Sequence, residues 1–485
     1  MAQQYDVAII GAGPGGYATA LRAAELGMSV ALIERDSTVG GTCLNRGCIP
    51  SKALITAAHA IETVRHADRF GVRADINGID LDKLRDYRID TVSTVVKGLS
   101  GLLAQRNIDV IRGEAEPTDP HTIRITSDGT DATGSEERSR RISTIAATHI
   151  VLATGGRPRP IPGEPFRDAL IDSTQALDLR EFPRKAVIIG AGAIAVEFAS
   201  MWNAAGGDVT LIIRKDRVLS GWDKRTGVTL TRELKRQGVT VVANASVTRI
   251  DTSDGTHATV RYTCAAADGD RSIDADVVLA AIGREPNTDA AWFDTLGIER
   301  DDHGLVVTDA FGRTNVDGVW AVGDITPGHA LAHRAFGQGI VVAETIAGLH
   351  PSPVDEATVP GIVFSSPEAA TVGLTVEQAK THDGLSNVAQ TAYPMMGNAR
   401  MLMSGTGGSL SVVSGETAHR PGVPVVLGVH IVAPNASDLI AEAQQIVGAR
   451  TPLSDAARLI HPHPTFSETL GEALLKADGR PLHTR

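Results

Sequence analysis

The stretch that decides the fold is Asp6–Arg35, DVAIIGAGPGGYATALRAAELGMSVALIER. An apolar strand pattern is followed by GAGPGG, an Ala- and Leu-rich helical pattern and a second apolar strand that ends at Glu34. Gly11 permits the tight turn, Gly13 lets the backbone approach a pyrophosphate at the helix N-terminus, and Gly16 allows close helix-to-strand packing. Glu34 can accept ribose hydroxyls. The segment predicts a βαβ dinucleotide-binding unit; the alternative is a glycine-rich turn without a ligand.

A second copy of this pattern lies far downstream, at Lys185–Asp216. Gly190, Gly192 and Ala195 stand in a Gly-x-Gly-x-x-Gly/Ala pattern between an apolar strand and a helix. A further parallel strand and glycine turn, VVLAAIGREPNT, closes this domain at Val277–Thr288. Two dinucleotide folds in one chain imply two bound nucleotides.

The two copies differ at the end of their second strand. The shared spacing places Ile213 where the first copy has Glu34, and the basic residues Arg214, Lys215 and Arg217 follow. A missing carboxylate removes the repulsion of a 2′-phosphate, and nearby cationic groups can pair with that phosphate. The second site therefore favours NADP over NAD, against the alternative that the basic residues form a solvated loop.

Two cysteines, Cys43 and Cys48, are separated by four residues in GGTCLNRGCIPSKAL, Gly40–Leu54. A zinc site would need two further ligands, and the third cysteine of the chain, Cys264, stands alone. Buried reduced thiols are the other alternative, although glycines and a proline crowd this pair. If a helix begins after Cys43, its positive end favours a thiolate, and Lys52 lies on the same face. The segment predicts a redox-active dithiol.

Composition limits the class of protein. The 485 residues predict three to four domains of typical size. The composition is globular, with 42% hydrophobic residues, and the net charge of -11 argues against a nucleic-acid or anionic-membrane partner. The N-terminus, MAQQYDVAIIG, has no basic leader, and no apolar run approaches the roughly 18 residues of a membrane-spanning helix. With so few cysteines, we expect a cytoplasmic protein.

The segment TNVDGVWAVGD delivers a carboxylate, Asp324, to the end of an apolar strand. Ligands of α/β sheets usually bind at the carboxyl ends of strands, so a hydroxylated chain such as ribityl is an expected partner. Helix capping by Asp324 is the alternative, and it is compatible with this role.

The tail contains HPHPTFSETLGEA, in which His463 precedes Glu468 by five residues. A carboxylate on one ring nitrogen would orient the imidazole and leave the other nitrogen to exchange protons with a thiol. A histidine near a glutamate is usually structural, but a dithiol elsewhere in the chain needs a general acid–base. The pair is therefore a candidate catalytic pair.

These motifs together resemble the flavin-dependent pyridine nucleotide-disulfide oxidoreductases from end to end: GAGPGG with Glu34, GGTCLNRGCIPSKAL, the ATG strand end, the second glycine motif, TNVDGVWAVGD and HPHPTFSE. Within that family, LNRGCIPSKAL, LAHRA and HPHPT are the forms of the dihydrolipoamide dehydrogenases. The implied fold is α/β, with two Rossmann-like domains for FAD and NAD(P) and a C-terminal α+β dimerisation domain. The expected domains are residues 1–157 for FAD, 158–285 for NAD(P), 286–353 completing the FAD site, and 354–485 for dimerisation.

The resemblance also implies the site residues. FAD would contact Gly11, Gly13, Gly16, Glu34, Gly41, Thr42, Lys52, Ala115, Thr154, Gly155, Asp324 and Ala332. NAD or NADP would contact Gly190, Gly192, Glu197, Arg214, Lys215 and Gly283, and Glu197 would pair with Lys52 beside the flavin. Cys43 and Cys48 would form the redox disulfide, with Cys48 facing the flavin and Cys43 exchanging with substrate. His463 and Glu468 would come from the partner subunit of a homodimer, and no metal is expected.

The implied reaction passes electrons from dihydrolipoamide through the Cys43–Cys48 disulfide and FAD to NAD(P)⁺, with a lipoyl group or a small thiol as substrate and a 2-oxoacid dehydrogenase complex as an expected partner. Most family members of this kind carry an acid where Ile213 stands. The absence of that acid in this chain argues against NAD specificity and against the catabolic role in such a complex. The second hypothesis is an NADPH-dependent reductase of a glutathione-type disulfide. A third is a catalytically idle structural subunit, which would predict a damaged site, whereas every candidate catalytic residue is present.

Overall fold

The computed structural model describes residues 3–129, 139–252, 255–265 and 267–484. The chain divides into two compact units, each assembled from three segments that are distant in sequence. The first unit comprises Met1–Ala53, Asp82–Pro158 and Arg284–Glu356. The second comprises Leu54–Leu81, Arg159–Gly283 and Ala357–Arg485.

The first unit is built on a sheet with a parallel core in the order β3-β2-β1-β6, in which β17 also pairs with β6 and the hairpin strands β5 and β4 continue the sheet antiparallel. Its strands are β1 (Gln3–Ile10), β2 (Val30–Glu34), β3 (Asp109–Arg112), β4 (Glu114–Asp119), β5 (Thr122–Gly129), β6 (Ser139–Leu152) and β17 (Val319–Ala321). Every residue of β2 is buried, as expected for a parallel strand that is covered on both faces.

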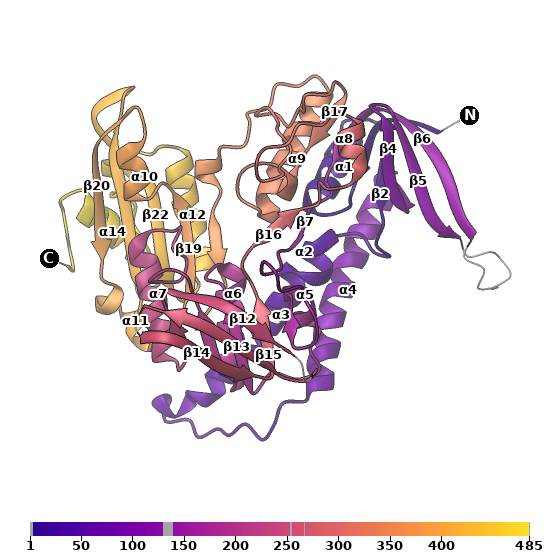
Figure 1. Ribbon diagram of the computed structural model, residues 1–485. Coiled ribbons are helices and arrows are strands. Elements are labelled where there is room, and N and C mark those ends of the chain that lie inside the picture. The colour runs from indigo at the N-terminus through magenta and orange to yellow at the C-terminus, as the bar shows by residue number, and fades with distance from the viewer. Residues whose placement is uncertain (1–2, 130–138, 253–254, 266, 485) are drawn as a thin grey trace. The chain divides into compact units, whose positions relative to one another are not determined.

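The helices of this unit are α1 (Pro14–Glu25), α2 (Gly41–Arg46), α4 (Leu81–Gln105) and α9 (Ala332–Ile346). Helix α3 (Cys48–Arg65) begins in this unit at Cys48 and continues into the second unit. Helices α1 and α9 lie side by side (Figure 1). Small residues permit this contact, since a Cβ on Gly339 would lie 2.8 Å from the carbonyl oxygen of Gly15. The glycine-rich helix α1 is thereby held between its own strands and α9.

The second unit contains a five-stranded parallel sheet in the order β11-β10-β9-β15-β8. Its strands are β8 (Leu170–Ile171), β9 (Lys185–Ile189), β10 (Asp208–Ile212), β11 (Thr240–Val242) and β15 (Val277–Ala280). Helices α6 (Ala193–Ala205) and α7 (Lys224–Arg236) follow β9 and β10, and β12 (Ala245–Asp251), β13 (Ala258–Cys264) and β14 (Ala267–Ala275) form a separate antiparallel sheet. The order β10-β9-β15 repeats the arrangement β2-β1-β6 of the first unit.

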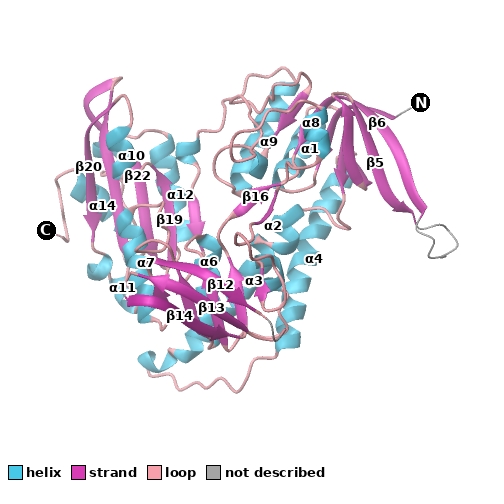
Figure 2. Cartoon of the chain, in the orientation of Figure 1, coloured by secondary structure: helices cyan, strands magenta, loops and turns pink. Residues whose placement is uncertain are grey.

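The C-terminal part of the second unit is an antiparallel sheet with helices packed on it (Figure 2). Its strands are β18 (Gly361–Val363), β19 (Glu368–Gly373), β20 (Leu385–Tyr393), β21 (Ser409–Thr417) and β22 (Arg420–Ala433), and its helices include α11 (Ala399–Ser404), α12 (Ala436–Gly448) and α14 (Glu468–Ala477). Val412, Ile431 and Leu474 are fully buried in its core. Strand β20 packs against α14, which brings residues about 70 positions apart in sequence together.

The predicted fold class is confirmed: two parallel βαβ sheets and a C-terminal α+β sheet are all present. In the part of the chain that is described, no helix combines the length and the apolar character needed to cross a bilayer.

Candidate functional site

The first glycine motif forms a cradle at the N-terminus of α1. Gly11 has φ +102°, and a Cβ there would lie 2.3 Å from the carbonyl oxygen of Ala153 at the end of β6. A Cβ on Gly16 would lie 1.8 Å from the carbonyl oxygen of Gly11. Gly13 is the N-cap residue of α1, so the N–H groups that follow it have no earlier helical partner. The sequence thus folds into a helix start that a phosphate can approach closely.

Glu34 lies at the end of β2 beside this cradle. Its side chain is buried, and its carboxylate accepts the backbone N–H groups of Ala12 and Asp36, both at 2.9 Å. A carboxylate has about four lone-pair positions, so two backbone donors leave capacity for ribose hydroxyls. The position and chemistry of Glu34 therefore fit a dinucleotide.

The start of α2 lies against the same glycine loop. Gly40 donates its backbone N–H to the carbonyl of Ala12 at 2.8 Å, and a Cβ on Gly41 would lie 2.7 Å from the Cα of Gly13. Thr42 follows Gly41 in the first turn of α2. The contact therefore brings the segment that contains the cysteines to the phosphate end of the cradle.

The two cysteines are present as a dithiol, with Cys43 half-buried in α2 and Cys48 exposed at the start of α3. A hydrogen bond between the two thiol groups, followed by burial and the repulsion of a second charge on Cys48, raises the pKa of Cys43. Lys52 acts in the opposite direction on that pKa. Burial, and then the charges of both cysteines, raises the pKa of Tyr17 in α1 to about 12. The pair is thus arranged to carry one negative charge more readily than two.

The Ala-Thr-Gly strand end is bound by a segment from far downstream. Thr154 donates from Oγ1 to the carbonyl of Asn287 at 2.8 Å, and the Asn287 side-chain amide donates to the carbonyl of Thr154 at 2.9 Å. Asn287 also donates its backbone N–H to the carbonyl of Gly155 at 2.8 Å. The predicted residue Ala115 lies in β4, half-buried against the core of the first unit. These contacts fix the edge of the sheet where Thr154 and Gly155 are expected to meet FAD.

Asp324 lies in a short 3-10 turn, Gly323–Ile325, that follows β17. Helix α9 starts at Ala332 and has Leu331 as its N-cap residue, so Asp324 does not cap it. Burial raises the pKa of Asp324, while Arg284 and Arg334 lower it, with Arg284 Nε 3.7 Å from the carboxylate. A mostly buried carboxylate at the end of a parallel strand is suited to accept hydroxyl groups.

The second glycine motif has the same construction. Gly190 has φ +139°, and a Cβ there would lie 2.2 Å from the carbonyl oxygen of Ala281. Gly192 is the N-cap residue of α6, and a Cβ on it would meet no described atom within 4 Å; the same is true of Gly283. Ala195 is fully buried beneath the loop. The cradle at the start of α6 is therefore open on the side where a pyrophosphate would bind.

The end of β10 places the basic residues at the surface. Ile213 is buried, whereas Arg214 and Lys215 are exposed. Arg217 differs from them, since it pairs with Asp216 at 2.9 Å. Two exposed cations therefore follow the position where the first motif has its acid.

Glu197 lies in α6, where it is buried and accepts the backbone N–H of Phe364 at 3.0 Å. Lys52 belongs to the first unit and Glu197 to the second. Their pairing beside the flavin stays a prediction.

His463 and Glu468 lie in the second unit. His463 Nδ1 and Glu468 Oε2 are 2.8 Å apart, and the His463 side chain is 79% exposed whereas that of Glu468 is 16% exposed. Glu468 is the first residue of α14, where the helix dipole favours a negative charge. The carboxylate therefore fixes one ring nitrogen and leaves the rest of the imidazole accessible.

Three residues that interact with these candidate site groups were not predicted from the sequence. The charges of the two thiols help to raise the pKa of Tyr17, Arg284 pairs with Asp324, and Asn398 donates to Glu468 at 2.6 Å. Tyr17 directly follows the glycine motif and Arg284 directly follows Gly283, so proximity to a motif was an available signal for these two. Asn398 is 70 residues from Glu468, and the sequence carries no such signal for it.

Comparisons with known proteins cover the whole chain. Residues 5–339 match the model of the pyridine nucleotide-disulphide oxidoreductase family, and residues 359–474 match the dimerisation domain of that family. The chain is 39% identical over 481 residues to the dihydrolipoyl dehydrogenase of Geobacillus stearothermophilus, covering 99% of this chain and 97% of that one. It is 38% identical over 483 residues to the dihydrolipoyl dehydrogenase of Halobacterium salinarum, and this match covers 99% of this chain and 97% of that one.

Solved structures agree with these relatives. The crystal structure of LpdA from Mycobacterium tuberculosis has a TM-score of 0.84 with 27% identity and covers 98% of this chain and 99% of its own. The flavoprotein disulfide reductase RclA from Escherichia coli, in its Cu(II) complex, has a TM-score of 0.81 with 27% identity and covers 97% and 99%. The predicted family is confirmed: the chain belongs to the pyridine nucleotide-disulphide oxidoreductases.

Proposed function

We propose that this chain is an FAD-dependent dithiol–disulfide oxidoreductase that oxidises dihydrolipoamide and reduces NAD(P)⁺. The observation that carries the proposal is the hydrogen-bonded thiol pair Cys43 and Cys48, located in the unit that also holds the first glycine cradle. Full-length relatives named dihydrolipoyl dehydrogenase support the lipoyl substrate.

FAD, when bound, supplies the redox group that couples the dithiol to the nicotinamide. The start of α1 at Gly13 would hold the pyrophosphate with backbone N–H groups, and Glu34 would accept the ribose hydroxyls. Asp324 would accept hydroxyl groups of the ribityl chain. The remaining proposed contacts are those of Gly11, Gly16, Gly41, Thr42, Lys52, Ala115, Thr154, Gly155 and Ala332.

The thiol pair performs the exchange with substrate. A substrate thiolate attacks Cys43 Sγ of the oxidised pair, the Cys43–Cys48 bond breaks, and Cys48 leaves as a thiolate. The second substrate thiol then attacks the substrate sulfur of the mixed disulfide, which releases Cys43 and the oxidised lipoyl disulfide. Because the pKa of Cys43 is raised, Cys43 takes up a proton and the negative charge of the reduced pair resides on Cys48. The exposed Cys48 is the thiol that we assign to the flavin side.

His463 takes up the second proton of the substrate dithiol. Glu468 accepts from Nδ1, which orients the ring and leaves Nε2 to exchange protons with a thiol. The match of residues 359–474 to a dimerisation domain supports a homodimer. We place His463 and Glu468 of each subunit at the thiol pair of the other subunit.

The nicotinamide coenzyme is proposed to be NADP. Arg214 and Lys215 are exposed directly after the buried Ile213, so two cations are available to a 2′-phosphate and no acid stands at this position to repel it. Gly190, Gly192, Glu197 and Gly283 are the other proposed contacts. The same basic residues favour a second candidate function, an NADPH-dependent reductase of a glutathione-type disulfide.

We also propose a partner complex and a cellular location for this chain. A lipoyl group is carried by proteins of 2-oxoacid dehydrogenase complexes, and such a complex is the proposed partner. The three cysteines in 485 residues support a reducing compartment, for which we propose the cytoplasm.

A matrix of substrates and coenzymes tests the function. The purified holoenzyme is assayed with lipoamide and glutathione disulfide, each with NADH and with NADPH. We expect lipoamide to give the highest kcat/KM and NADPH to be preferred. A higher kcat/KM with glutathione disulfide would favour the second candidate. A colourless protein that takes up no FAD would refute both.

A further inference from the structure

A buried amide holds the His463–Glu468 pair from the side away from the imidazole. Asn398 Nδ2 donates to Glu468 Oε1 at 2.6 Å, while Glu468 Oε2 lies 2.8 Å from His463 Nδ1. Each carboxylate oxygen therefore has its own side-chain partner. Asn398 as a whole residue is 4% exposed, so little solvent competes with its amide for this bond.

The orientation of the Asn398 side chain is determined by its other contacts. Nδ2 also donates to the carbonyl of Thr465 at 3.1 Å, and Oδ1 accepts the backbone N–H of Met401 at 3.0 Å. Reversing the amide would place its oxygen against two acceptors and its NH₂ group against a donor. Asn398 is therefore a donor to Glu468, and it also holds the backbone two residues after His463.

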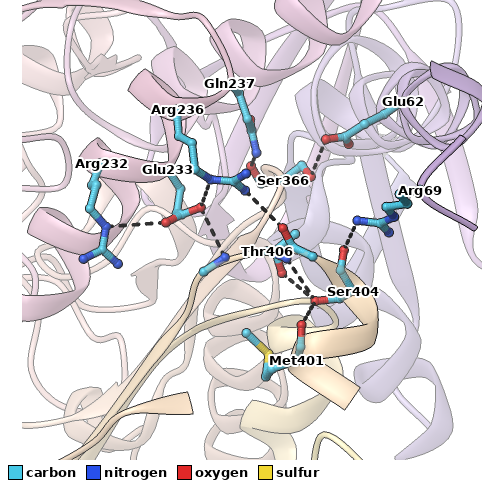
Figure 3. A network of polar contacts seen from close by, with 12 residues as sticks. Glu62, Arg69, Arg232, Glu233, Arg236, Gln237, Ser366, Met401, Ser404 and Thr406 are labelled. Atoms are coloured by element: carbon cyan, nitrogen blue, oxygen red, sulfur yellow. Dashed lines mark hydrogen bonds and ion pairs between the residues drawn. The ribbon is translucent and has the colours of Figure 1, made fainter. Parts of the chain in front are cut away.

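Asn398 itself is fixed because it caps α11, and the other end of α11 is tied separately. Figure 3 shows the Ser404 hydroxyl donating to the carbonyl of Met401, at 2.7 Å, and Arg69 donating to the carbonyl of Ser404, at 2.5 Å. Arg236 donates to the carbonyl of Gly405 at 3.4 Å. Asn398 therefore holds the N-terminal end of α11, and contacts that do not involve the acid–base pair hold its C-terminal end.

Other titratable groups face Glu468 without replacing this bond. His461 interacts electrostatically with Glu468, but its ring is hydrogen-bonded to Glu442 at 2.8 Å, which raises the pKa of His461. Burial, followed by Glu472 and Glu468, raises the pKa of Tyr393. Among the residues that the structure describes, the side chains hydrogen-bonded to the Glu468 carboxylate are those of His463 and Asn398.

We propose that Asn398 is a positioning residue for the general acid–base. Its amide holds the Glu468 carboxylate so that Oε2 accepts from Nδ1 of His463, which presents Nε2 to the substrate thiol. This inference rests on the proposed function, because the pair has a catalytic task only if a dithiol is exchanged. It predicts that loss of the donor slows proton transfer with dithiol substrates and leaves the nicotinamide half of the reaction intact.

Two variants separate this role from helix capping. Asn398→Asp and Asn398→Ser keep a side-chain oxygen that can cap α11 but remove the amide NH₂ group that donates to Glu468. We expect each to lower kcat with dihydrolipoamide about tenfold or more, out of the roughly 10²- to 10⁴-fold that a positioned acid–base supplies. KM for dihydrolipoamide and the rate from reduced nicotinamide to an artificial electron acceptor should stay within about twofold of wild type. Ser404→Ala is the matched control, since it weakens the other end of α11, and its kcat should be that of wild type.

A double-mutant cycle gives the decisive readout. If Asn398 acts through Glu468, then adding Asn398→Ser to Glu468→Ala should lower kcat no further than Glu468→Ala alone. Additive losses, or an equal loss in Ser404→Ala, would show a structural role for Asn398 and overturn the inference. Wild-type kcat in both Asn398 variants would also overturn it while leaving the proposed function in place. A wild-type holoenzyme inactive with every dithiol would instead refute the proposed function.

Discussion

Replacing Gly13 with alanine should weaken FAD binding while sparing the fold. Gly13 has φ −73° and ψ −177°, an extended conformation that alanine adopts without strain. The nearest atom to an added Cβ is the Cα of Gly41 at 3.9 Å, an ordinary van der Waals contact. At Gly16 the same change would place a Cβ 1.8 Å from the Gly11 carbonyl oxygen, although real Cβ atoms essentially never approach within 3.0 Å. The two glycines therefore separate an effect on the ligand from an effect on the fold.

The expected loss of FAD affinity in Gly13→Ala follows from the contacts that a phosphate makes at a helix start. If the new methyl group separates the pyrophosphate from two backbone N–H donors, two charge-assisted bonds of about 1.5 kcal/mol each are lost. The sum of about 3 kcal/mol corresponds to a roughly 150-fold weaker Kd for FAD. The cost to folding is that of a less favourable N-cap residue, about 0.5–1 kcal/mol. Gly16→Ala should destabilise the FAD-free protein by several times this amount, because α1 must move away from the sheet.

Flavin fluorescence titration of the FAD-free protein and its thermal unfolding measure the two effects. Gly192→Ala is the matched control, since Gly192 caps α6 with φ −85° and ψ −175° and an added Cβ there meets no described atom within 4 Å. It should bind FAD as wild type does and bind the nicotinamide coenzyme more weakly. Wild-type FAD affinity in Gly13→Ala, or weakened FAD binding in Gly192→Ala, would refute the assignment of the two cradles.

Three further changes test the site. Cys43→Ser or Cys48→Ser should reduce lipoamide turnover more than about 1,000-fold yet spare electron transfer from reduced nicotinamide to artificial acceptors; loss of both activities with FAD bound would contradict the assigned roles. Replacing Arg214 and Lys215 with alanine should lower kcat/KM for NADPH about 10- to 100-fold with little change for NADH, whereas equal losses would refute the proposed phosphate contact. Burial raises the pKa of Asp324 above its ordinary value of 3.8, so the folded chain binds this proton more tightly than the unfolded chain and Asp324 lowers stability as pH rises above 3.8. Asp324→Asn should therefore raise the Tm of the FAD-free protein at pH 7 and weaken FAD binding; a lower Tm would contradict the assigned burial effect.

Features contained in one short segment could be predicted from the sequence. Each βαβ unit places its strand, glycines and helix within about 30 residues, so spacing alone specifies the turn, the cap and the strand end near Glu34 and Ile213. The same holds for Cys43 and Cys48 and for His463 and Glu468, whose separations of five residues bring their side chains within reach of one another in the observed structure. The short chain between two such residues limits where their side chains can point, so their proximity can be predicted without knowledge of the tertiary structure.

Contacts between distant segments were decided by the tertiary structure alone. Asn398 reaches Glu468 across 70 residues because β20 packs against α14. Arg284, the first residue of β16 (Arg284–Pro286), meets Asp324, which follows β17, although these two strands belong to different sheets. Gly41 lies against Gly13 only because α2 returns to the start of α1. Such contacts depend on the packing of whole helices and strands, which many weak apolar contacts determine together. The spacing of residues along the chain does not predict that packing.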